Sequence, residues 1–186
     1  MGYGIMPYRV NLDRVTSLIG TSKEHVREDV KSYCSRRASR IDSLSSSGEN
    51  DPKFMDIVEE LLDGKATHKH YGFMYWYAIE DFIKMCGTMM VNTELVSVRA
   101  GDMDFFFRKF KMNNHFRSPL TFSIPTPDEF PTVLVKLSSE IDEFLMTTFK
   151  EAPLKFPQFS ETEYEQIQSW LVEAKQNEQD LVLYYY

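Results

Sequence analysis

The segment "YGFMYWYAIEDFIKMC", residues 71–86, constrains the fold most because it is a long apolar and aromatic run with few polar positions. At about 100° per residue, one wide side of the segment is apolar and the opposite side is narrow and polar. The spacing therefore predicts a buried helix over residues 71–86, ended by Gly87. Inward-facing side chains are expected at Tyr71, Tyr75, Phe82 and Cys86. Glu80 and Lys84 are expected to face outward as an i,i+4 ion pair.

Two of the four histidines, His68 and His70, precede this helix at alternate positions. On a helix their side chains would point about 160° apart, so they would share a side only in an extended segment. Two imidazoles are fewer than the three or four ligands of a stable metal site, and no H-E-x-x-H pattern occurs. A general base would need an orienting partner and a substrate pocket, and the sequence shows neither. We therefore expect no metal, no cofactor and no catalytic residue, with the histidines as polar residues at a helix entrance.

Capping signals and apolar periodicity predict further helices on both sides of this segment. They are expected over residues 11–20, from residues 21–24 onward, and over residues 51–64, 138–149 and 160–176. Thr21 with Glu24 and Ser160 with Glu163 have the spacing of capping boxes, and Asp51 is expected to cap its helix.

Runs of branched and aromatic residues predict strands at both ends of the chain and before residue 138. These runs are residues 3–10, 132–137 and 181–186. The serine run within residues 42–50 predicts a flexible loop. The sequence therefore predicts one α+β domain over residues 1–186, helix-rich, with a small sheet that includes the N- and C-terminal strands.

The charge of the chain is distributed unevenly. The last fifty residues hold ten acidic side chains against three lysines, and this accounts for the whole net charge of −7. Such a surface repels nucleic acid and favours a basic protein partner, although a solvated surface that keeps the chain soluble is the simpler interpretation. No apolar run approaches the roughly 20 residues of a membrane span, and no signal peptide is recognisable, so we expect a cytoplasmic protein without membrane contact.

A nucleic-acid site is an alternative over residues 108–117, where basic residues alternate with phenylalanines. Arg108 and Arg117 bound this segment, and mixed basic and aromatic side chains are typical of single-strand binders. The same residues fit an ordinary amphipathic helix, and the acidic net charge disfavours binding.

Three motifs together resemble a known family. They are "YGIMPYRVNLDRV" at the start, "YGFMYWYAIEDFIKMCG" in the middle and "SIPTPDEFPTV" before a predicted strand and helix. In this order they resemble an uncharacterised bacterial domain-of-unknown-function family, and more distantly the YfbM-like domains. Asn11 replaces the aspartate usual in the first motif, and the last 35 residues lie outside the resemblance. The resemblance implies no activity and transfers no catalytic residues. Small bacterial domains of this general kind include immunity proteins that neutralise toxins.

Taken together, these features favour a non-catalytic cytosolic protein-interaction module, with an immunity-type inhibitor of a bacterial toxin as one form of it. Phe73, Tyr77 and the terminal tyrosines 184–186 are the expected exposed anchors beside the acidic surface. The alternative is a small-molecule-binding protein or enzyme with a pocket near His68 and His70, to which Tyr75 and Glu80 would contribute. The oligomeric state and the identity of the partner do not follow from the sequence.

Overall fold

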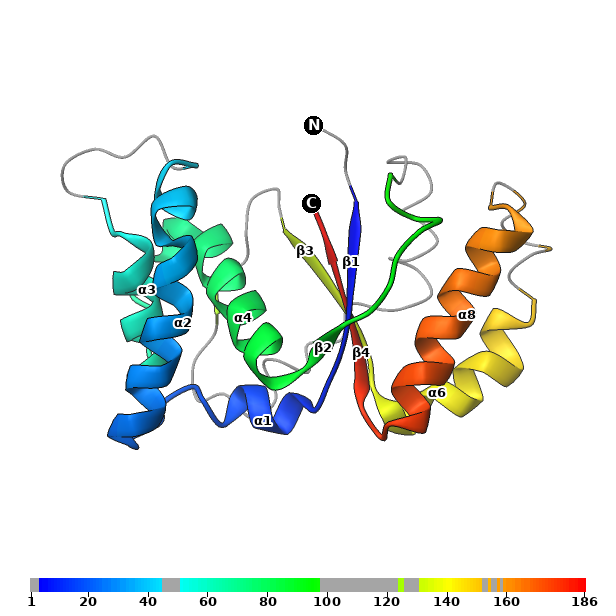
Figure 1. Ribbon diagram of the computed structural model, residues 1–186, viewed down its shortest axis with the longest axis horizontal. Helices are drawn as coiled ribbons and strands as arrows, with labels where there is room; N and C mark the ends of the chain where they lie inside the picture. The colour runs from blue at the N-terminus through cyan, green and yellow to red at the C-terminus, as the bar shows by residue number, and fades with distance from the viewer. Residues whose placement is uncertain are drawn as a thin grey trace. The chain divides into compact units, whose positions relative to one another are not determined.

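Helices and a small antiparallel sheet make up the computed structural model, which describes residues 4–44, 51–97, 124–125, 131–151, 154, 157 and 159–186. In these residues the sheet has four strands in the order β2-β1-β4-β3 (Figure 1). Their bounds are Ile5–Val10 for β1, Thr88–Met89 for β2, Thr132–Lys136 for β3 and Asp180–Tyr185 for β4. The predicted α+β class and the three predicted strands are confirmed. β2 was not predicted because two residues carry no periodic signal.

The two chain ends pair with each other inside this sheet. β1 and β4 are antiparallel neighbours over six residue pairs, with Tyr8 opposite Val182. Pro7 lies in β1 although it has no N–H to donate. Its carbonyl accepts from Met90 N at 2.8 Å. A residue's N–H and C=O point to the same side of a strand, so the donor missing at Pro7 would face the short β2 and not the β4 ladder.

The described residues form two compact units, and the first contains the sheet with the helices α6 (Ser138–Phe144) and α8 (Glu161–Gln176). A π-helical segment, η4 (Leu145–Phe149), extends α6. The predicted capping box at the start of α8 is confirmed, because Ser160 Oγ accepts from Glu163 N and Glu163 Oε2 accepts from Ser160 N. The buried stripe of α8 is Tyr164, Ile167, Trp170, Leu171 and Ala174. α8 packs on β1 and β4 with this stripe.

The second unit is helical. It contains α1 (Leu12–Thr16), α2 (Glu24–Asp42), α3 (Phe54–Leu62), the 3-10 turn η1 (Lys69–Tyr71) and α4 (Gly72–Cys86). α4 packs against α1, α2 and α3. The predicted stripe of α3 is buried in full: Phe54, Ile57, Val58, Leu61 and Leu62. Gly64 ends α3 with a φ of +72°, as its position predicted.

Two predicted helix caps were wrong. α2 begins after Lys23, and Thr21 Oγ1 accepts from Lys23 N, so Thr21 does not cap Glu24. α3 begins after Lys53, and its first N–H, on Phe54, donates to Asp42 Oδ1 at 2.7 Å, so Asp51 is not its cap. A tertiary contact from the end of α2 replaces the local cap in this case.

The sequence predicts Gly87 as the C′ residue of α4, a position that usually has a positive φ. In the structure Gly87 follows α4 but does not have a positive φ. A Cβ atom there would lie 2.5 Å from the carbonyl oxygen of Arg9 and 2.7 Å from Val10 Cβ. Glycine is therefore required at this position because β1 approaches it closely. The prediction of a single domain over residues 1–186 stays a prediction.

Candidate functional site

Helix α4 occupies most of the predicted span, and its Tyr75 and Phe82 are fully buried as expected. Tyr71 and Cys86 are only half-buried. The prediction that Glu80 faces solvent was wrong, because only 1% of it is exposed. The ion pair with Lys84 does form, at 3.0 Å. Since α4 has α1, α2 and α3 packed around it, its narrow polar side is also covered.

Arg37 of α2 provides the charge that Glu80 and its neighbour need in this buried position. Its Nη1 lies 2.7 Å from Glu80 Oε2 and 2.6 Å from Asp81 Oδ1. The guanidinium also lies over the Tyr77 ring, 5.5 Å from its centroid. We call Arg37, Glu80, Asp81 and Lys84 the Arg37 cluster. Its two carboxylates are paired with two cations, as buried charges must be.

Asp81 is the most deeply buried member of the Arg37 cluster. Burial raises its pKa above the usual range, against the opposing attraction of Arg37. Its Oδ2 is buried and accepts no hydrogen bond from the residues that the structure describes. The nearby thiol of Cys34 is fully buried, and this burial together with the charge of Asp81 raises its pKa to about 12. A thiol in this state is unreactive, so the cluster has the character of a helix-packing contact.

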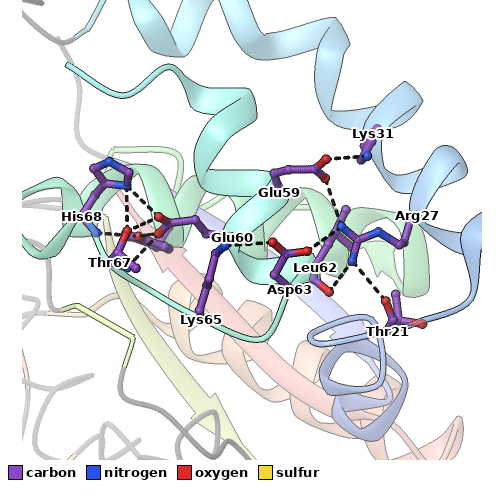
Figure 2. Close-up of polar contacts among 11 residues, drawn as sticks. Thr21, Arg27, Lys31, Glu59, Glu60, Leu62, Asp63, Lys65, Thr67 and His68 are labelled. Atoms are coloured by element: carbon purple, nitrogen blue, oxygen red, sulfur yellow. Dashed lines mark hydrogen bonds and ion pairs between the residues drawn. The ribbon is translucent and has the colours of Figure 1, made fainter. Parts of the chain in front are cut away.

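A second group of polar side chains joins α3 to the start of α4 (Figure 2). His68 Nδ1 lies 2.9 Å from Glu60 Oε1. Glu60 Oε2 accepts from Thr67 N at 2.8 Å and from the Tyr75 hydroxyl, and Oε1 accepts from the Thr67 hydroxyl. The backbone N of His68 donates to the Tyr75 hydroxyl at 3.1 Å. We call Glu60, Thr67, His68 and Tyr75 the Glu60–His68 cluster.

The hydrogen bonds of this cluster keep the Glu60 carboxylate ionised. Burial alone would raise its pKa, but the bonds from Thr67 and Tyr75 outweigh burial and hold the pKa below its usual range. Burial and the bond to Glu60 both raise the pKa of Tyr75, so this hydroxyl stays protonated. The cluster is a buried anion with protonated donors around it and an imidazole at its outer edge.

The two histidines do not share one side in the structure. His68 precedes the 3-10 turn η1 and His70 lies within it, so residues 68–70 are not an extended strand. His70 is exposed, and no contact joins it to His68 in the described part of the chain. Neither Glu60 nor Thr67 was predicted for the site. The capping and apolar patterns gave no signal for them, because a carboxylate on α3 meets the loop after it only in the fold.

The expected aromatic anchors are less exposed than predicted. Phe73 and Tyr77 are half-buried, and their rings meet edge to face with centroids 6.2 Å apart. Tyr184 and Tyr185 are buried because β4 is an inner strand of the sheet, and only Tyr186 is half-exposed. The prediction of exposed anchors was therefore wrong for Tyr184 and Tyr185.

A neighbouring network of hydrogen bonds and ion pairs at the surface joins α2 to the end of α3 (Figure 2). Arg27 Nη1 donates to the carbonyl of Leu62 at 2.7 Å, and Nη2 contacts Asp63 at 2.7 Å and Glu59 at 3.3 Å. Glu59 also pairs with Lys31 at 2.7 Å. These contacts satisfy a free carbonyl at the helix end and are sufficient to explain the charges there.

The helices α6 and α8 of the first unit both carry exposed carboxylates. α6 with η4 runs antiparallel to α8, since Lys175 contacts Asp142 at 2.8 Å and the Phe149 ring lies 5.9 Å from that of Tyr164. Glu143 on α6 and Glu161 and Glu165 on α8 are exposed. We call Glu161 and Glu165, which lie four residues apart on one side of α8, the acidic face.

Some predicted features lie outside the described residues: Arg108, Arg117 and residues 45–50 of the serine-rich loop. In the described ranges, no three His, Cys, Asp or Glu side chains gather closely enough to hold a metal ion. No helix in the same ranges is long and apolar enough to cross a membrane.

Comparison with known proteins identifies a family. The family model described as "Domain of unknown function (DUF7691)" matches residues 1–186, so the chain belongs to this family. The expected membership of an uncharacterised family is thereby confirmed. No curated protein and no solved structure matches the chain.

Proposed function

We propose that this member of the DUF7691 family is a non-catalytic protein-interaction module that binds a basic protein through its acidic face. An immunity-type inhibitor of a bacterial toxin is one form that such a module takes, and a cytoplasmic location fits this role. Nucleic acid is the less favoured partner, because the net charge of −7 opposes it.

The observation that carries the proposal is the position of Glu161 and Glu165 on α8. The two exposed carboxylates are four residues apart, so they lie on the same side of the helix. Like charges at this spacing destabilise a helix by about 0.2–0.5 kcal/mol. Neither carboxylate forms an ion pair with another described residue. A lysine or arginine of a partner, placed between the two carboxylates, would attract both and offset their repulsion.

An exposed apolar side chain on the neighbouring segment η4 supports the proposal. Met146 is 77% exposed and lies one helical turn after Glu143. Interfaces combine a desolvated apolar contact with a charged rim, and methionine is enriched in them. A basic partner with an apolar side chain among its lysines and arginines would therefore fit the acidic face.

The proposal is tested by capture from lysate of the source cell with three immobilised proteins. These are the wild type, a Glu161→Lys/Glu165→Lys variant and a control, Glu24→Lys/Glu28→Lys. The control reverses two exposed carboxylates at the same spacing on α2, so it changes the net charge equally. Binding is measured at about 50 mM and about 300 mM salt, since screening weakens contacts between exposed charges.

We expect a basic protein to be retained by the wild type and the control, lost from the α8 variant, and released at high salt. Equal capture by all three proteins would refute a role for the acidic face. If the immobilised wild type captures no basic protein that is released at high salt, the proposed partner class is refuted.

A further inference from the structure

The Glu60–His68 cluster fixes His68 through both its ring and its backbone N–H. The ring of His68 is fixed by its Nδ1 contact with Glu60, and its backbone N–H is fixed by the Tyr75 hydroxyl. Two anchors on one residue restrict both the main chain and the ring. This is more than a polar residue at a helix entrance requires, because a cap needs a single hydrogen bond.

The contact also determines where the proton of a neutral His68 lies. Glu60 is an ionised carboxylate and only accepts hydrogen bonds, so the ring nitrogen that faces it, Nδ1, must carry the proton. The lone pair is then on Nε2, which Figure 2 shows on the side of the ring turned away from Glu60. The His68 side chain is 39% exposed, and its buried partner Glu60 lies on the Nδ1 side. A carboxylate bound to Nδ1 fixes the tautomer and the orientation of the ring.

The charges around His68 favour an anionic reactant. The described carboxylates near it are engaged: Asp63 pairs with Arg27 and Lys65, and Asp51 accepts from the Tyr71 hydroxyl. The next two residues of the chain, Lys69 and His70, are exposed. An anion that approaches this turn therefore meets the exposed cation of Lys69, while Asp63 and Asp51 are already paired.

We propose that His68 is a nucleophile that accepts a phosphoryl group from a small acyl phosphate. Nε2 attacks phosphorus, an N–P bond forms, the bond between phosphorus and the acyl oxygen breaks, and the carboxylate leaves. No proton moves in this step. The Nδ1–H stays bonded to Glu60, whose negative charge balances the positive charge on the phosphorylated ring. Glu60 is a positioning residue, and the site is independent of the acidic face.

The reaction is tested with the full chain and acetyl phosphate at about pH 8, where histidine is ordinarily neutral. Intact mass and ³¹P NMR measure incorporation into the wild type, a His68→Asn variant and a His25→Asn control. His25 is an exposed histidine on α2, outside the cluster. We expect one acid-labile phosphoryl group on the wild type and the control and none on the His68 variant. An unlabelled wild type, or equal labelling of all three, would overturn the proposal.

A Glu60→Gln variant tests the positioning residue. Loss of a carboxylate behind a reactive histidine slows its reaction by roughly tenfold to a hundredfold. Long-range ¹H–¹⁵N spectra of the wild type add a measurement that needs no substitution. They should show a neutral His68 with its proton on Nδ1, and less of this tautomer in the variant. A proton on Nε2 in the wild type would contradict the assigned geometry even if the variant failed to fold.

Discussion

Arg37 Nη1 lies 2.6 Å from Oδ1 of Asp81, a side chain with no exposed surface, so a partly exposed cation neutralises a fully buried anion. The two residues are separated by 44 positions, and their contact joins α2 to α4. The attraction offsets the cost of burying the carboxylate only while both partners are present. The pair is therefore a condition for α4 to pack on α2.

Replacement of this cation should be costly. Arg37→Met leaves two buried carboxylates with Lys84 as the remaining described cation of the cluster. Loss of one partner of a buried pair costs about 3–5 kcal/mol, and the low end applies because the Arg37 side chain is 26% exposed. Urea denaturation measures the loss. Arg40→Met, at an exposed position on α2, should change the free energy of unfolding by less than about 0.5 kcal/mol. Equal effects of the two substitutions would contradict the assigned role.

The thiol of Cys34 should be inert in the folded chain. It is fully buried, and burial raises its pKa to about 12, so almost no thiolate exists at neutral pH. We expect a thiol-reactive disulfide reagent to label Cys86, which is half-buried, before Cys34. Peptide mapping after timed labelling distinguishes the two cysteines. Labelling of Cys34 should require denaturant, and its rapid labelling in buffer would show that the interface of α2 and α4 opens.

The Glu60 carboxylate should make stability depend on pH. Its pKa is lower in the folded chain than in the unfolded one, so it stabilises the fold above its ordinary pKa of about 4.3. This stabilisation is lost as the pH falls through the folded value. The difference in free energy of unfolding between wild type and Glu60→Gln should therefore shrink between about pH 5 and pH 3.

Tyr75→Phe provides the matched variant for this pH series, because it removes one of the hydrogen bonds that lower the Glu60 pKa. Its stability difference from wild type should shrink over the same pH range with a smaller amplitude. Denaturant titrations at several pH values measure both differences. A difference for Glu60→Gln that grows on acidification would show that Glu60 is not held as an anion.

Gly87→Ala should destabilise the contact between β1 and the chain after α4. The new methyl group would meet the Arg9 carbonyl oxygen at 2.5 Å, and that oxygen belongs to the backbone of a sheet strand. Overpacking of this kind costs about 1–3 kcal/mol. Thermal unfolding measures the effect, with Thr88→Ala at the next, exposed residue as the control. A fully stable Gly87→Ala protein would mean that this close approach is not maintained.

Local patterns predicted those parts of the fold that depend on neighbouring residues. The stripe of α3 and the capping box of Ser160 and Glu163 are set by spacings of three and four residues, and both are confirmed. The burial of Glu80 was missed because a helical wheel gives directions around one helix only. It does not show that Arg37, on a different helix, covers the polar side.

The candidate sites were less predictable than the helices. His68 was singled out from the sequence, but its partner Glu60 lies eight residues earlier on another element, and the turn between them decides the contact. The terminal tyrosines 184–186 were predicted to be exposed anchors. β4 instead pairs on both sides, with β1 and β3, and this strand order has no local signal.

The affinity of the captured basic partner for the three purified proteins tests the interaction proposal most directly. It is measured by calorimetry at two salt concentrations. Loss of two charge contacts that each contribute about 1.4 kcal/mol would weaken binding roughly a hundredfold. We expect this loss for the variant with lysines at Glu161 and Glu165, less than a threefold change for the control at Glu24 and Glu28, and weaker wild-type binding at high salt. Equal affinities for the two variants, or wild-type binding that is insensitive to salt, would contradict binding through the acidic face.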